Sequence, residues 1–198
     1  MTADPHGLAG IGHNRGPDMS AGRSWRRHSW TEARRQLLPQ LPIEVLRLRL
    51  RRARELGLDY RSYASIRAAS GHDVIAFLFS SNALRLLPPE PALPADRAAR
   101  LEALINCGRI GLAQGRLDGP RMIRLSAGLL EAAGPAPAPF GPWAEARQRV
   151  LDVLTAGPGA PLSPGEVVLV GDTTPEREWC AAARLAGYLP AERFFTTA

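Results

Sequence analysis

Residues 167–176, Val-Val-Leu-Val-Gly-Asp-Thr-Thr-Pro-Glu, decide the fold class of this sequence. The apolar run Val167–Val170 predicts a strand, the clearest one in the chain. A threonine then caps a helix that opens on proline, Glu176 completes a capping box, and Gly187 ends the helix. A strand that leads directly into a helix predicts a βαβ unit, and therefore a parallel sheet with helices packed against it.

Further strands and helices are expected on the N-terminal side of this unit and after it. The predicted strands are Val74–Phe79, Arg109–Ala113, Val167–Val170 and Arg193–Thr196, and the predicted helices are Asp96–Asn106, Pro120–Ala133, Pro142–Ala156 and Pro175–Ala186. A proline-rich connector is predicted at residues 134–142. The fold class is α/β: a small three-layer domain, residues 71–198, with three or four mostly parallel strands.

The first third of the chain predicts a different organisation. Residues 1–22 are rich in glycine and have no apolar periodicity, which predicts a flexible tail. Residues 23–70 predict a basic helical segment, with helices at Trp30–Leu38, Pro42–Leu56 and Tyr60–Ser70. The length of 198 residues suits one domain with a tail or two very small domains.

The positive charge of the chain is concentrated in this first third. All 25 basic residues are arginine, and the net charge is +6. Residues 1–61 hold 12 arginines against 6 acids, whereas the rest of the chain holds 13 of each. A GC-rich genome accounts for arginine in place of lysine but not for this asymmetry, which indicates an acidic partner.

The leading functional hypothesis is a non-catalytic binding or regulatory protein that binds an acidic partner, with nucleic acid as the first expectation, through its N-terminal surface. Tryptophan rings offer stacking faces and arginines offer phosphate contacts. The residues expected to form this surface are Trp25, Arg26, Arg27, Trp30, Arg47, Arg51, Arg52 and Arg54. The alternative is that the tryptophans staple the tail to the core and the arginines form a solvated face.

A second hypothesis places a small enzyme or ligand-binding domain at the carboxyl ends of two strands. The candidate pocket residues are Ser80, Ser81, Asn82, Asp172, Thr173 and Thr174. A helix N-terminus at this edge favours an anion, so the ligand would be phosphorylated or nucleotide-like. Capping alone also explains the threonines. A single open concavity shared by Asp172 and Ser80 or Asn82 would favour the ligand.

Several classes of chemistry are excluded by missing motifs. The sequence has no Gly-x-Ser-x-Gly elbow, no Gly-Lys phosphate loop and no His-Glu-x-x-His zinc helix. Val167–Asp172 resembles the late strand-Gly-Asp motif of haloacid-dehalogenase-like phosphatases, but the Asp-x-Asp pair of that family is missing. Cys107 and Cys180 are expected to be buried, inert thiols. No cofactor or metal site is predicted.

Three stretches resemble a group of short alphaproteobacterial proteins for which no activity is known. They are Gly10–Pro17 (GIGHNRGP), Leu41–Leu87 and Val167–Phe195. The resemblance implies a bacterial, cytoplasmic protein. The low cysteine count agrees with a reducing compartment, and we expect neither a membrane span nor a secretory signal.

Overall fold

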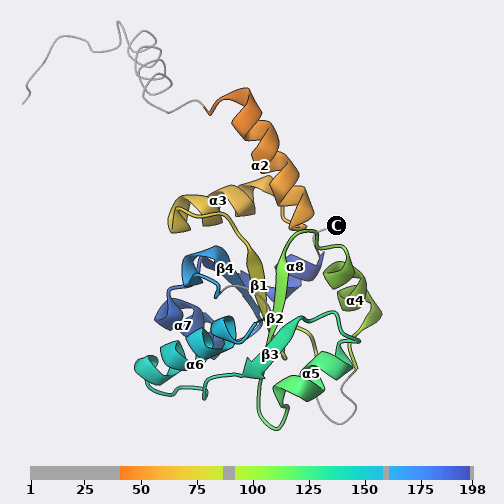
Figure 1. Ribbon diagram of the computed structural model, residues 1–198, viewed down its shortest axis with the longest axis vertical. Helices are drawn as coiled ribbons and strands as arrows, with labels where there is room; N and C mark the ends of the chain where they lie inside the picture. The colour runs from red at the N-terminus through yellow and green to blue at the C-terminus, as the bar shows by residue number, and fades with distance from the viewer. Residues whose placement is uncertain (1–40, 87–91, 158–160, 197–198) are drawn as a thin grey trace, which may run out of the picture. The chain divides into compact units, whose positions relative to one another are not determined.

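The computed structural model of the chain describes residues 41–86, 92–157 and 161–196 (Figure 1). The chain divides into two units, Met1–Pro42 and Ile43–Ala198, and every element described below belongs to the second. The expected tail, the helix at Trp30–Leu38 and the candidate residues Trp25, Arg26, Arg27 and Trp30 lie outside the described residues.

A five-stranded parallel sheet forms the centre of the second unit (Figure 1). Its strands are β1 (Ala76–Ser80), β2 (Gly108–Ala113), β3 (Ala132–Pro135), β4 (Val167–Gly171) and β5 (Gly187–Pro190), in the order β3-β2-β1-β4-β5. Each neighbouring pair runs parallel. The α/β class is therefore confirmed, with five strands instead of the three or four expected.

Helices cover both faces of this sheet. They are α2 (Ile43–Glu55), α3 (Tyr60–Ser70), α4 (Ala95–Glu102), α5 (Gly119–Leu125), α6 (Trp143–Thr155), α7 (Thr174–Ala183) and α8 (Ala191–Thr196), with a 3-10 turn at Pro164–Glu166. The core on one face receives side chains from α2, α3, α4, α5 and α8. The core on the other face receives them from α6 and α7. This gives the three layers that the sequence predicts.

Alternation along the central strand β1 separates the two cores. Phe77 and Phe79 belong to the core beneath α3 and α8, whereas Ala76 and Leu78 belong to the core beneath α6 and α7. Successive side chains of a strand point to opposite faces, so the continuous apolar run fills both cores. All five residues of β1 are buried.

The direction in which successive strands are added to the sheet reverses between β1 and β4. The chain moves outward from β1 through β2 to β3, returns over α6, and continues from β4 to β5 on the other side of β1. In an open α/β sheet, a crevice forms outside the carboxyl ends of the strands at such a switch point, and ligands bind there.

The predicted helix Pro120–Ala133 is wrong in its second half. Helix α5 ends at Leu125, and Ala127 and Gly128 take positive φ angles of 52° and 76° that turn the chain. The chain then enters β3, which contains Pro135 from the expected connector. Proline lacks a backbone N–H, and β3 tolerates it because it is an edge strand.

The predicted strand Arg193–Thr196 is also wrong, since these residues belong to helix α8. The last strand is the shorter β5, which precedes it. Phe194 is buried, and its ring lies 4.9 Å from that of Phe77 in an edge-to-face contact. Tertiary packing of this aromatic side chain therefore outweighs the local β propensity of the Phe-Phe pair.

Two further helices are shorter than predicted, and a left-handed residue follows each of them. Helix α4 ends at Glu102, and Asn106, which was expected to close it, has a φ of 52°. Helix α7 ends at Ala183, where Arg184 turns the chain with a φ of 55°.

Candidate functional site

The carboxyl ends of β1, β2 and β4 bring polar residues together at the switch point. Phe79 of β1 pairs with Gly111 of β2 and with Val170 of β4, so these three strands end side by side. The residues that follow them are Ser81 and Asn82 after β1, Gln114 after β2, and Asp172 and Thr173 after β4. The sequence therefore predicts correctly that the Ser80 and Asp172 segments share one edge.

A buried carboxylate ties the three strand ends to one another. Glu176, in the first turn of α7, is fully buried. Its Oε1 accepts hydrogen bonds from Asn82 Nδ2 at 3.1 Å and Gln114 Nε2 at 2.7 Å. Its Oε2 accepts from the backbone N–H groups of Asp172 at 2.6 Å and Thr173 at 2.8 Å. Four donors satisfy a carboxylate, which explains how the fold holds this group away from water.

The capping box predicted from the sequence is the local origin of this arrangement. Glu176 is the third residue of α7 and reaches back to the N-terminal cap, Thr173. The two N–H groups before the helix are consequently bonded to the protein's own carboxylate. An anionic ligand at this helix start would have to displace Glu176, so the N-terminus of α7 does not favour a phosphate.

Glu176 also fixes the orientation of two side-chain amides. Because the NH₂ groups of Asn82 and Gln114 donate to Glu176, their carbonyl oxygens are left to accept hydrogen bonds. In the described part of the chain, Gln114 Oε1 accepts only a long hydrogen bond, of 3.5 Å, from Ser81 Oγ. The strand ends therefore carry two amide oxygens that can accept hydrogen bonds.

The two serines predicted as pocket residues, Ser80 and Ser81, form structural hydrogen bonds within the protein. Ser80 and Ser81 are buried. Ser80 Oγ accepts from the N–H of Ala83 at 3.0 Å, and Ser81 Oγ accepts from the N–H of Gln114 at 3.3 Å. These bonds set the loop after β1 and join it to the end of β2.

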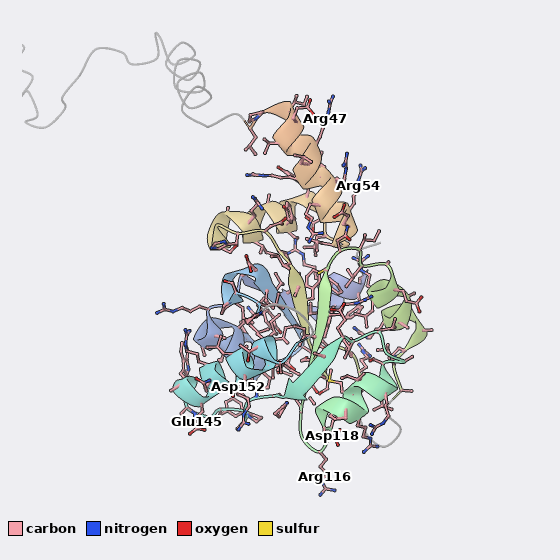
Figure 2. The ribbon with its side chains drawn as sticks, in the orientation of Figure 1. Arg47, Arg54, Arg116, Asp118, Glu145 and Asp152 are labelled. Carbon is pink, nitrogen blue, oxygen red and sulfur yellow. The ribbon has the colours of Figure 1, made fainter. Side chains whose placement is uncertain are left out.

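A cleft of about 700 Å³ opens beside these groups, on the face covered by α6 and α7. Its polar lining comes from Asn82, Gln114, Thr173, Glu145 and Arg149. Its apolar lining comes from residues 135–139, 141 and 142, from Ala146 and Pro175, and from the buried Trp179. Figure 2 shows Glu145 on α6. A mostly apolar cleft of this size with a few polar groups is typical of a small-molecule site.

Asp172 lies apart from this cleft and lines a second cavity with Arg85 and Arg97. Partial burial raises the pKa of the Asp172 carboxyl, and the charge of Arg97 opposes that rise.

Thr173 is extended, with φ −119° and ψ 160°, and it lines the first cleft. Asn82 and Asp172 therefore face different cavities, although both follow adjacent strands. Thr174 is exposed and is absent from the lining of both.

The expected basic surface is only partly formed by α2. Arg47, Arg51 and Arg54 are exposed, and Figure 2 shows Arg47 and Arg54 along this helix. Arg47 pairs with Glu44 of its own helix at 3.0 Å, in an exposed contact. This part of the surface remains accessible to a partner.

Arg52, by contrast, forms ion pairs and hydrogen bonds within the protein. It pairs with Glu55 at 2.9 Å and with Asp73 at 3.5 Å. It also donates to the carbonyls of Val74 at 2.8 Å and Asn106 at 3.1 Å. These contacts attach α2 to the segments before β1 and β2, so Arg52 is removed from the candidate surface.

Three residues of this region are not predicted as site residues from the sequence: Gln114, Glu176 and Arg97. The capping-box pattern does identify Glu176 as a helix-capping acid. Its hydrogen bonds to the loops after β1 and β2 cannot be predicted without the strand order. Cys107 and Cys180 are buried as expected, and burial raises their pKa values to about 12 and about 11.

Comparisons with protein-family models, curated proteins and solved structures find no match for this chain. None of the helices in residues 41–86, 92–157 and 161–196 has the length and apolar character needed to cross a membrane. Over the same residues, no three His, Cys, Asp or Glu side chains gather as metal ligands would.

Proposed function

We propose that this chain is a small-molecule-binding protein whose ligand occupies the cleft beside Asn82 and Gln114. The observation that carries the proposal is the pair of amides at the edge of the cleft whose NH₂ groups Glu176 holds, which leaves their carbonyl oxygens able to accept hydrogen bonds. The buried carboxylate preorganises both groups, which reduces the free-energy cost of ordering them when a ligand binds.

The chemistry of the cleft narrows the ligand class. Two carbonyl acceptors call for a ligand that brings donors, such as hydroxyl, amino or ring N–H groups. Trp179 and the prolines of segment 135–142 provide an apolar wall for the body of the ligand. The charged side chains in the lining are Glu145 and Arg149, whose formal charges cancel. A neutral, nucleoside-like or sugar-like molecule fits this lining better than a phosphorylated one.

A fragment library followed by ligand-detected NMR tests this proposal. We expect the hits to be enriched in neutral molecules with hydrogen-bond donors. Ala138 lies exposed in the cleft lining, so the variant Ala138→Trp should fill the cleft and abolish their binding. The matched control Ala99→Trp, on the exposed side of α4, should retain it. Hits that bind Ala138→Trp as well as the wild type would refute the site.

The exposed arginines of α2 support a second candidate function, the binding of nucleic acid or another acidic partner. Arg47, Arg51 and Arg54 are free of the contacts that hold Arg52 in the fold. Neutralising phosphates releases counterions, so binding should weaken steeply with salt.

Fluorescence anisotropy with a labelled single-stranded oligonucleotide tests this second candidate. Replacing Arg47, Arg51 and Arg54 by Glu should abolish binding. The control reverses three other exposed arginines, Arg116, Arg121 and Arg124, and should reduce affinity only slightly. Equal losses in the two triple variants, or no binding at low salt, would reject α2 as the interface.

A cytoplasmic location and a relationship to the alphaproteobacterial group remain part of the proposal. Both are supported by the sequence stretches that resemble that group. The two buried thiols are compatible with a reducing compartment.

A further inference from the structure

A second cavity, of about 780 Å³, lies at the same edge of the sheet and is lined largely by charged residues. Arg85 comes from the loop after β1, Asp172 from the loop after β4, and Asp96 and Arg97 from α4. Glu192 and Phe195 come from α8. Four separate segments therefore deliver two guanidinium groups and three carboxylates to one space.

Arg97 is the least expected of these residues, because its side chain is buried. Only 5% of the residue is exposed. Its guanidinium lies over the ring of Phe195, 4.1 Å from the ring centroid, and Nη1 donates to the carbonyl of Ala83 at 2.6 Å. Its Nε finds no hydrogen-bond partner among the residues that the structure describes. Burial, and then the charge of Arg85, lowers the pKa of Arg97.

A buried cation without an anionic partner is costly for a fold. No carboxylate in the described part of the chain lies within 4.0 Å of the Arg97 nitrogens. Within the described segments, Arg85, Asp96, Asp172 and Glu192 likewise form no ion pair. The five groups therefore face a common cavity without neutralising one another through direct contacts.

The pattern of charges indicates what kind of ligand would neutralise them. Two arginines call for a carboxylate, and the acids call for an ammonium group. With three acids against two arginines, the lining carries a formal charge of −1, so a ligand with an extra positive charge complements it. Among the described residues no cluster of metal ligands occurs, so these acids are not gathered as they would be around a metal ion.

We propose that this cavity is a binding site for a free α-amino acid, preferentially one with a basic side chain. The ligand carboxylate pairs with Arg97 and Arg85, and its ammonium and cationic side chain pair with Asp172, Asp96 and Glu192. Arg97 is fixed in advance by Phe195 and by the carbonyl of Ala83, so it provides a rigid docking point for the carboxylate. The site is independent of the cleft beside Gln114.

Isothermal titration calorimetry of the full chain with single amino acids tests this inference. L-Arginine and L-lysine should bind more tightly than L-alanine, and L-glutamate should bind most weakly. Agmatine, which lacks the carboxylate, and N-acetyl-L-arginine, which lacks the ammonium group, should each lose roughly tenfold or more in affinity. A ranking led by L-glutamate, or no binding of any amino acid at millimolar concentration, would overturn the proposal.

Variants locate the binding in this cavity. Arg97→Met keeps the apolar stem but removes the charge, and it should abolish binding. Since Arg97 also supports the loop at Ala83, the exposed lining variants Arg85→Met and Asp172→Asn provide the measurement that does not depend on folding, with an expected loss of roughly tenfold each. The control Glu102→Gln, exposed on α4 outside the cavity, should bind as the wild type does. Unchanged affinity in Arg85→Met and Asp172→Asn would refute the site.

Discussion

Gln114 and Glu176 lie 62 residues apart in the sequence, and Gln114 Nε2 donates a 2.7 Å hydrogen bond to Glu176 Oε1. This bond joins the end of β2 to the start of α7 across the switch point of the sheet. Together with the bond from Asn82, it makes one buried carboxylate the centre on which three strand-end loops are assembled. Asn82 and Gln114, which this carboxylate holds, line the cleft.

The first prediction concerns this carboxylate. Glu176→Gln places an amide NH₂ where Oε1 or Oε2 now accepts two hydrogen bonds, so buried donors lose their partner. We expect the free energy of unfolding to fall by about 3 kcal/mol. Urea denaturation followed by circular dichroism measures it. Glu178→Gln, two residues further along α7, should stay within about 0.5 kcal/mol of the wild type. Equal stability of the two variants would contradict the role of Glu176.

A second prediction tests the attachment of α2. Arg52→Met removes two ion pairs and the hydrogen bonds to Val74 and Asn106 while keeping the apolar stem. The loss of charged hydrogen bonds in a largely buried setting should cost about 2 kcal/mol. The adjacent Arg51 is exposed, and Arg51→Met should change stability by less than about 0.5 kcal/mol. If both substitutions have the same effect in urea denaturation, Arg52 does not anchor the helix.

The third prediction concerns the thiols. Burial raises the pKa of Cys107 to about 12 and that of Cys180 to about 11, so neither forms thiolate near neutral pH in the folded protein. A colorimetric disulfide reagent at mildly alkaline pH should react with both cysteines of the unfolded chain and with neither in the native state. Rapid modification of the native protein would show that one thiol is accessible and reactive.

The fourth prediction is a pH dependence at the start of α3. Asp59 accepts hydrogen bonds from the N–H and the hydroxyl of Ser62, and these bonds lower its pKa below 3.8. The stabilisation that the ionised Asp59 gives the folded state is fully present above the pKa of Asp59 in the unfolded chain. It is lost as the pH falls through the lower pKa of Asp59 in the folded protein. Asp59→Ala should therefore cost about 1 kcal/mol near neutral pH.

The acid limb of the stability curve checks this assignment. The stability difference between wild type and Asp59→Ala should stay constant down to mildly acidic pH and shrink as the pH falls below 3.8. A difference that does not change with pH would mean that the ionised carboxylate is not the stabilising form.

The sequence predicts the parts of the fold that local signals encode. The apolar runs of β1 and β4 are long enough to identify buried strands, and Asp59 and Gly71 mark both ends of α3. The short strands β3 and β5 have four residues each, and they are defined by pairing with β2 and β4 more than by composition. Helix α8 was misassigned because Phe194 and Phe195 favour strand locally, whereas the aromatic core receives Phe194 on a helix.

The candidate site shows the same division. The sequence places Asn82 and Thr173 at one edge, because parallel strands end together. It does not reveal that Glu176 occupies the N–H groups before α7, nor that Asp172 and Asn82 face different cavities. Both facts depend on the directions of side chains in three loops, which the sequence pattern does not give. Because of these two facts, the ligand proposed for the cleft is a hydrogen-bond donor, whereas the sequence predicts an anionic ligand.

The most direct test of the central claim is a crystal structure of the chain with the tightest-binding neutral fragment. The account predicts that the fragment lies in the cleft and donates a hydrogen bond to Asn82 Oδ1 or Gln114 Oε1, while Glu176 keeps its four donors. A fragment that instead binds outside the cleft, or an anion that displaces Glu176 from the N–H groups of Asp172 and Thr173, would contradict it.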